Sequence, residues 1–396
     1  MKRDLITKIV FIALALLITN SASASEVQVD GAAKGVVGAE KPKVELVFVL
    51  DTTGSMSHLI QAAKDKIWSI TNTIASAKPV PEIEIGIVAF RDRRDHYITK
   101  NYTLTPDLDS IYNQLMGFKA AGGGDTPESV NQALYEAVTK NIWDKDESTY
   151  KVIFLVGDSP PHMNYQDDVK YGETCKIAAE KGIIINTIQC GDRRDTTPYW
   201  QEIASLTQGE YFSVSQRGDY VSYKTTYDKE IAEKSKALDA TRFYYGGEKV
   251  KKKAKAKIES EKKIYESAAP ASVAQRGGFN IKASGQKNFL GNNELIDSVV
   301  SGEVTLEDVA DDELPEEMQE MDAEERQNFI KDNNDKRERL KREISELSGK
   351  RQQSIQEQVK KEADGGKNSL DMKIFKSIKK QAEKKDLNYE METPEY

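Results

Sequence analysis

The 396-residue chain has few of the side chains that usually hold transition metals, with only three His and two Cys. A structural zinc site generally needs four such ligands close together, so this composition excludes one. It also leaves little room for acid–base catalysis by histidine. The 57 basic and 65 acidic residues give a formal net charge of −8, which argues against nucleic acid as the main partner. Any metal ion is therefore expected to be a hard cation held by oxygen.

Long apolar runs are also scarce. Positive residues precede a ten-residue apolar run at 9–18, and small residues end at Ala24. This layout is typical of a secretory signal peptide over 1–24, with cleavage after Ala24. Ten apolar residues are too few to span about 30 Å of hydrocarbon, which argues against an uncleaved anchor helix. We therefore expect an exported protein, periplasmic or secreted, with no transmembrane segment after cleavage.

Export would place the two cysteines in an oxidising compartment, which favours disulfides. Cys175 falls in a helix-like stretch at 172–181, and Cys190 ends a strand-like run at 183–190. If that helix packs back along that strand, the two thiols differ in height by about 10 Å. That offset exceeds the reach of a disulfide. Two buried thiols are the favoured interpretation, and a bond remains the alternative.

The main body of the chain has the pattern of an α/β protein. Residues 25–42 are small and polar, and predict a flexible leader. From residue 43, nearly continuous apolar strands alternate with helices, which predicts a doubly wound, mostly parallel sheet covered on both faces. Strands are expected at 44–50, 83–90, 97–105, 152–156, 183–190 and 211–214, with 97–105 at an edge. Helices are expected at 55–77, 107–118, 127–141, 167–181 and 198–207.

The rest of the chain is polar and largely helical. Residues 241–302 combine a basic helix with a linker, which we place at 268–286, and residues 303–396 form a charged helical region. In that region a long helix is expected at 315–362 and an amphipathic one at 370–387. The apolar stripe of the long helix holds no heptad past two turns, so a sustained coiled coil is not supported. The Lys-rich run at 249–263 is expected to be a solvated face, with anionic lipid or an acidic partner as the alternative.

Oxygen-bearing side chains follow the predicted strands at three places. Asp51-Thr-Thr-Gly-Ser55 follows the first strand, Gly122–Glu128 joins two helices, and Asp158 follows the strand at 152–156. In open α/β sheets, ligands bind beyond the carboxyl ends of the strands where the strand order reverses. Carboxylates and hydroxyls without His or Cys suit magnesium (Mg²⁺), with Mn²⁺ or Ca²⁺ as substitutes.

The motifs D-x-T-G-S, G-G-G-D-T-P-E and V-G-D-S-P-P-H resemble the von Willebrand factor A (VWA) domain and its metal-ion-dependent adhesion site (MIDAS). The resemblance covers about residues 43–240 and implies a Rossmann-like fold with strand order 3-2-1-4-5-6. It implies metal ligands in three loops. For the second loop both Thr126 and Glu128 are candidates, because many family members have a Thr ligand there, whereas the D-T-P-E motif is similar to the integrin beta subset, in which the Glu reaches the metal. The implied ligands are Asp51, Thr53, Ser55, Thr126, Glu128 and Asp158.

The resemblance implies a non-enzymatic protein-binding or adhesion module of the bacterial cell envelope. Its Mg²⁺ ion would bind an Asp or Glu carboxylate of a protein partner. A metal-assisted hydrolase is the alternative from another class, because Mg²⁺ with carboxylates can activate water. No catalytic residue is assigned, since the sequence shows no Ser or Cys nucleophile paired with a base. A third hypothesis is an envelope-assembly scaffold that acts through its helical tail.

Overall fold

The structure is a computed structural model that describes residues 41–396 apart from 125, 215–222, 363–365, 367–368 and 396, and apart from the side chains at 58, 62, 63 and 65. The predicted signal peptide at 1–24 and nearly all of the leader at 25–42 lie outside the described residues. Residues 41–396 form one compact unit.

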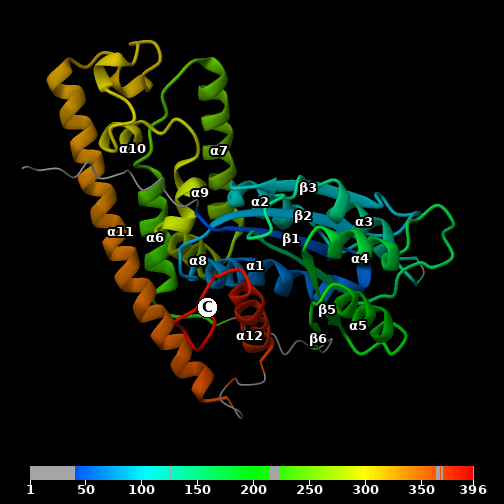
Figure 1. Ribbon diagram of the computed structural model, residues 1–396. Helices are drawn as coiled ribbons and strands as arrows, with labels where there is room; N and C mark the ends of the chain where they lie inside the picture. Colours follow the sequence, from blue (N-terminus) through cyan, green and yellow to red (C-terminus); the bar gives the residue numbers. More distant parts are fainter. Residues whose placement is uncertain (1–40, 125, 215–222, 363–365, 367–368, 396) are drawn as a thin grey trace, which may run out of the picture. The chain divides into compact units, whose positions relative to one another are not determined.

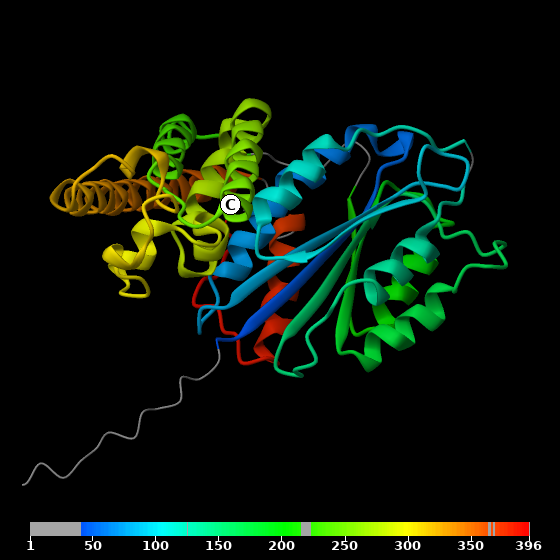
Figure 2. The same ribbon diagram turned by 90° about the horizontal axis from the view of Figure 1, so that it is seen from above.

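A six-stranded sheet forms the core of this unit (Figures 1 and 2), in the order β3-β2-β1-β4-β5-β6. Only β3 is antiparallel to its neighbour. The predicted fold class, a doubly wound and mostly parallel sheet, is confirmed. The strands are β1 (Lys43–Asp51), β2 (Glu82–Phe90), β3 (Thr99–Thr105), β4 (Tyr150–Gly157), β5 (Ile183–Cys190) and β6 (Tyr211–Val214).

Helices cover both faces of the sheet, so the central strands are apolar on both sides. In β1, Leu46 and Phe48 point into one core, and Val47 points into the other. The first core includes α1 (Ile60–Ala75), α2 (Leu108–Gly117) and α12 (Leu370–Glu383). The second includes α3 (Val130–Thr139), α4 (Tyr171–Glu180) and α5 (Thr197–Leu206).

The two cysteines lie in different cores. Cys175 is buried in the core that contains α4, and Cys190 in the core that contains α1. Both are free thiols, so the favoured interpretation of the sequence is confirmed. The sheet itself separates them, which is a stronger obstacle to a disulfide than the offset in height.

The helical part contains α6 to α11 and differs from the sequence prediction at two places. Residues 268–286 were expected to be irregular, yet they contain helix α8. Pro270 suits the first turn of a helix, and Val273 and Phe279 are buried in the core beside α1. The long helix begins at 323 rather than 315, because Asp322 and Glu325 form a capping box. The helices are α6 (Asp228–Asp239), α7 (Glu248–Ser267), α8 (Pro270–Asn280), α9 (Gln286–Leu290), α10 (Leu295–Val300) and α11 (Ala323–Lys360), and the 3-10 turns are Gly54–His58, Ala283–Gly285, Leu306–Asp308 and Glu316–Met318.

Helix α11 buries a stripe that includes arginines. Ile330, Arg337, Ile344 and Arg351 are spaced seven residues apart, and all four are buried. The two arginines are neutralised by buried acids: Arg337 Nη2 lies 2.8 Å from an oxygen of Glu294, and Arg351 also pairs with an acid. The stripe packs against α6 and α8 of the same chain. The buried face of this helix is therefore longer than its apolar residues alone predict.

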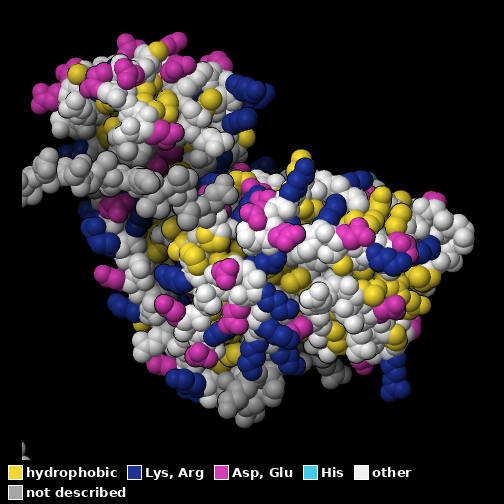
Figure 3. Space-filling view, viewed as in Figure 1, with side chains coloured by type: hydrophobic (Ala, Val, Ile, Leu, Met, Phe, Trp, Pro, Cys, Tyr) yellow, Lys and Arg dark blue, Asp and Glu magenta, His cyan; other side chains and the backbone are white. Residues whose placement is uncertain are grey.

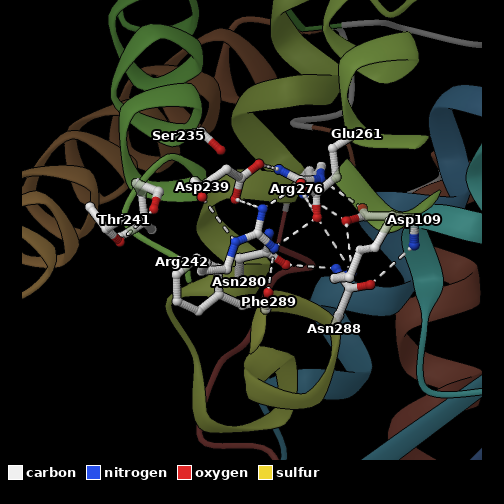
Figure 4. Close-up of polar contacts among 12 residues, drawn as sticks. Asp109, Ser235, Asp239, Thr241, Arg242, Glu261, Arg276, Asn280, Asn288 and Phe289 are labelled. Carbon is white, nitrogen blue, oxygen red and sulfur yellow. Dashed lines mark hydrogen bonds and ion pairs between the residues drawn. The ribbon is translucent and has the colours of Figure 1, made fainter. Parts of the chain in front are cut away.

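Buried ion pairs join α2 of the sheet domain to α8 (Figure 4). Arg276 Nε and Nη2 donate to the two carboxylate oxygens of Asp109, each at 2.6 Å. Arg276 Nη1 donates to Asp239 of α6 at 2.7 Å. The side chains of Arg276 and Asp109 are fully buried. Arg242 and Glu261 extend the same network.

Charge on the helical part is segregated. The side chains of Lys249, Lys252, Lys253 and Lys255 on α7 are exposed, in agreement with the predicted solvated face. Acidic side chains gather over residues 303–325 (Figure 3), where most of the acids are exposed. Within the described part of the chain, no helix combines the length and the apolar character needed to cross a bilayer.

Candidate metal centre

The first loop presents a carboxylate and two hydroxyls. Asp51 is the last residue of β1 and is 1% exposed. Its Oδ1 accepts hydrogen bonds from the Thr53 amide at 2.8 Å and the Thr53 hydroxyl at 2.6 Å. The Thr53 and Ser55 hydroxyl oxygens lie 3.1 Å apart. Asp51 Oδ2 has no hydrogen-bond partner among the described residues, although it is buried.

The third loop lies beside the first because β4 pairs with β1. Asp158 follows β4 directly and is 2% exposed. Its Oδ1 accepts a hydrogen bond from the Ser159 hydroxyl at 3.0 Å. Gly157 allows this approach, since a Cβ there would lie 2.9 Å from Asp51 Cβ and 3.0 Å from Asp51 Oδ2. A larger residue at 157 would therefore displace the Asp51 carboxylate.

The second loop brings Glu128 to the first loop. Glu128 is 2% exposed, and its amide donates to the carbonyl of Pro160 in the third loop at 2.9 Å. Gly123 lies between: a Cβ there would lie 3.4 Å from Glu128 Oε1 and 3.3 Å from Thr53 Cβ. The other oxygen, Glu128 Oε2, is buried without a hydrogen-bond partner in the described part of the chain.

Thr126 lies apart from these side chains. It is exposed, and its hydroxyl accepts a hydrogen bond from Arg193 Nη1 at 3.4 Å. Of the two residues predicted for the second loop, Glu128 is the buried one, and its Oε1 and Thr53 Cβ both border Gly123. The structure thus brings together Asp51, Thr53, Ser55, Glu128 and Asp158.

The carboxylates of this site repel one another. Burial, and next the charge of Asp158, raise the pKa of Asp51 to about 7. Burial, followed by the charges of Asp51 and Asp92, raises the pKa of Glu128 to about 9. A bound divalent cation would favour the ionised form of both groups.

The residues fit a hard divalent cation. Asp51 and Glu128 each have one buried carboxylate oxygen without a hydrogen-bond partner among the described residues. The other oxygen of Asp51 bonds the Thr53 hydroxyl, which lies 3.1 Å from that of Ser55, and the other oxygen of Glu128 borders Gly123, as Thr53 does. These are the oxygen ligands that Mg²⁺ accepts. Among the described residues, no group of three or more His, Cys, Asp or Glu side chains has the arrangement of a metal cluster. An ion held here would need the Thr53 and Ser55 hydroxyls as well as the carboxylates.

By its composition alone, the run Arg91-Asp-Arg-Arg-Asp95 beside this site predicts a solvated, charged loop. Asp92 is nevertheless 3% exposed and accepts hydrogen bonds from the Ser129 hydroxyl at 2.8 Å and the Tyr165 hydroxyl at 2.7 Å. Asp95 accepts from a backbone amide of the glycine loop at 3.1 Å. Nothing in the run R-D-R-R-D distinguishes a buried acid from a solvated one. The prediction of a solvated loop is therefore wrong for Asp92.

Comparison with known families agrees with the fold. The sequence model of the von Willebrand factor A domain matches residues 45–218. Together with the strand order, this match supports a VWA domain in this part of the chain. The fold is thus the Rossmann-like VWA fold, with a helical region toward the C-terminal side. Such domains are commonly protein-interaction modules that bind protein partners.

Individual proteins resemble only parts of the chain. A putative ariadne-like RING finger protein of Acanthamoeba polyphaga mimivirus is 25% identical over 199 residues, which are 46% of this chain and 19% of that protein. The von Willebrand factor A domain-containing protein 7 of Homo sapiens is 37% identical over 97 residues, 24% of this chain and 10% of that protein. The chain thus spans a fifth or less of the length of these curated relatives.

Two solved structures show a similar extent of likeness. The proximal thread matrix protein 1 from the mussel byssus, with a zinc-occupied MIDAS motif, is 16% identical with a TM-score of 0.36, and the likeness covers 45% of this chain and 43% of that one. The SpRpn10 VWA domain is 15% identical with a TM-score of 0.34, covering 44% of this chain and 89% of that one.

Proposed function

We propose that this protein is a non-enzymatic protein-binding module whose VWA domain holds one divalent cation, Mg²⁺, in a MIDAS. Asp51, Thr53, Ser55, Asp158 and Glu128 would hold the ion, and Thr126 would contribute only if the second loop rearranged. The ion would supply Lewis-acid attraction for an Asp or Glu carboxylate of a partner protein. Its own ligands would leave a position open for that group.

The observation that carries this proposal is the pair of unpartnered buried oxygens, Asp51 Oδ2 and Glu128 Oε2. A buried polar atom without a partner costs about 1–3 kcal/mol, and more when it is charged. The two atoms belong to carboxylates from separate loops that both border the Thr53 loop, which favours a ligand that satisfies both. A cation does so and also offsets the repulsion that raises the two pKa values.

The proposal also covers where the protein acts. The charged n-region, the apolar run at 9–18 and Ala24 support export by a signal peptide, so the partner would be another protein of the cell envelope. A test is cell fractionation of the full chain with mass spectrometry of its N-terminus. An N-terminus at Ser25 in the exported fraction is expected, and an intact Met1 inside the cell would contradict export.

The partner-binding proposal is tested by affinity capture from an envelope extract with Mg²⁺ and with EDTA. Wild-type protein should retain a defined partner set in Mg²⁺ that EDTA releases, and Asp51→Ala should not retain it. Thr103→Ala, a change on the edge strand β3, is the matched control and should behave as wild type. Capture that is identical with EDTA and in Asp51→Ala would contradict the proposal.

The same preparations distinguish the hydrolase. Phosphatase or peptidase turnover with Mg²⁺ or Mn²⁺ that is lost in Asp51→Ala would show that the protein is an enzyme and not a binding module. We expect the turnover rate of wild type to equal that of Asp51→Ala, because the described residues of the loops offer metal ligands but no base paired with a nucleophile.

A further inference from the structure

A second candidate binding site lies at the other end of α1, around residues 388–395. This segment runs beside α11 and α12 (Figure 1, red). The amide and carbonyl of Asn388 each form a 2.8 Å hydrogen bond with the backbone of Lys78, as in an antiparallel strand pair. Tyr389 is buried and packs edge-on against Phe375 with ring centres 6.1 Å apart. The segment is therefore held at Asn388 by a single strand-like bridge, and it bends at residues 392 and 393.

Side chains of two helices contact the backbone of this segment. The Glu395 amide donates to the Thr73 hydroxyl at 3.3 Å, and the Ser69 hydroxyl donates to the Glu395 carbonyl at 3.1 Å. From α11, Gln352 Nε2 donates to the carbonyl of Pro394 at 2.9 Å. These contacts are made to the backbone and do not depend on a particular side chain of the segment.

Two further contacts recognise side chains. Lys282 Nζ lies 2.5 Å from Glu395 Oε2, and the Ser76 hydroxyl donates to the same oxygen. Gln356 Nε2 donates to the Thr393 hydroxyl at 3.2 Å. The side chains of Lys282 and Glu395 are 23% and 28% exposed, so the pair is shielded from water but not sealed. The groove therefore selects a carboxylate after proline and a hydroxyl two residues before it.

The groove is larger than the part occupied by residues 393–395. A cavity of about 890 Å³ continues beside them, and its wall includes the small residues Gly278, Ser345, Ser348 and Gly349. A Cβ at Gly349 would meet nothing within 4 Å. A longer or differently directed peptide could therefore make additional contacts that the chain's own segment does not make.

We propose that the groove between α1, α8 and α11 is a peptide-binding site for an acidic segment with the pattern Thr-Pro-Glu, and that residues 393–395 occupy it in cis. A partner protein that carries such a segment would compete for the groove. Each hydrogen bond contributes only about 1 kcal/mol net, and an attached segment acts at an effective concentration on the order of millimolar. A free peptide of equal affinity therefore displaces the cis occupant only at about millimolar concentration, and a partner competes at lower concentration where it makes additional contacts or where the cis contacts are weakened. The groove is separate from the metal site, because it lies at the opposite end of the 16-residue helix α1.

The test uses the full chain and a fluorescein-labelled, amidated peptide of residues 388–396. Glu395→Lys in the chain places like charges beside Lys282 and should release the cis segment. Peptide affinity, measured by fluorescence polarisation, should be about tenfold or more higher for this variant than for wild type. Lys282→Glu alone, which places like charges beside the chain's own Glu395, should also release the cis segment. This variant should not bind the wild-type peptide and should bind a peptide whose Glu395 is replaced by Lys.

Two controls keep the test decisive. Circular dichroism melting shows whether each variant folds, and Glu395→Gln replaces Glu395→Lys if the latter does not. Mg²⁺ binding measured on the same variants should equal wild type, which separates this inference from the metal site. Equal peptide affinity in wild type and in the Glu395 variant, or binding unaffected by Lys282→Glu, would overturn the proposal.

Discussion

At the scale of single residues, the site depends on oxygen atoms that the fold buries without partners. Asp51 uses one carboxylate oxygen to fix the Thr53 amide and hydroxyl, and the other stays available. Gly157 and Gly123 matter because a Cβ at either position would crowd this arrangement. The carboxylate and hydroxyls are thus arranged before any ion binds.

The second loop gives a prediction at this scale. Glu128→Gln removes a charged oxygen ligand and should weaken Mg²⁺ binding by about tenfold or more. Thr126→Ala, the matched variant two residues away, should change it little because that hydroxyl faces Arg193. Titration calorimetry of both variants measures this. The reverse order would assign the ion to Thr126.

At the scale of elements, buried ion pairs join α2 to α8. Asp109 would be costly to bury alone, and Arg276 makes it tolerable through two hydrogen bonds. Burial alone would raise the pKa of Asp109, but the charge of Arg276 and its hydrogen bonds outweigh that and lower it to about 2. The two elements are therefore coupled by charge as well as by apolar packing.

Removing one partner of this pair tests its role. Arg276→Met leaves Asp109 buried without its cation and should lower the free energy of unfolding by about 3–5 kcal/mol. The double variant Asp109→Leu with Arg276→Met should recover part of that loss, because position 109 then no longer carries a buried charge without its cation. Urea denaturation gives both values. A double variant no more stable than the single one would contradict this explanation.

The same pair predicts an acid limit. The folded-state pKa of Asp109 lies below its unfolded value of about 3.9, so its contribution to stability is complete above about pH 4. It is lost as the pH falls through about 2, when the folded protein binds the proton. The Asp109→Asn variant should therefore show a shallower loss of stability between about pH 4 and pH 2. Identical slopes in denaturation curves would rule this out.

At the scale of the whole molecule, the C-terminal side of the chain returns to the sheet. Helix α12 packs in the same core as α1, β1 and β4. It follows α6 to α11 in the chain, and most of those helices lie away from that face of the sheet. Tyr150 of β4 and Asn186 of β5 both hydrogen-bond Gln381 of α12, at 2.8 and 3.1 Å. The sheet domain therefore includes a helix from far along the sequence.

A core substitution in α12 tests this arrangement. Ile378 is fully buried, so Ile378→Ala should lower the free energy of unfolding by about 2–5 kcal/mol and move the transition of the sheet domain. Lys376→Ala, exposed on the same helix, is the control and should change little. If Ile378→Ala affected only a separate transition of the helical part, α12 would not belong to the sheet domain.

The sequence was most informative where local pattern and tertiary environment agree. The strands at 183–190 and 211–214 and the start of α12 at 370 were predicted at their observed residues, since apolar runs and amphipathic periods mark them directly. The order of the strands came from the family resemblance alone. Helix α8 was missed because its glycines suggest irregular structure, while its burial depends on distant partners. The burial of Asp92 was missed because it too depends on partners far away in the sequence, Ser129 and Tyr165.

The most direct test of the central claim is titration calorimetry of Mg²⁺ into the metal-free full chain and into Asp51→Ala. The wild-type chain should bind one ion, and Asp51→Ala should bind none while melting at or above the wild-type temperature in EDTA, because it loses a buried and repelled carboxylate. Mg²⁺ binding of equal affinity and stoichiometry in both proteins would contradict the assignment of this site.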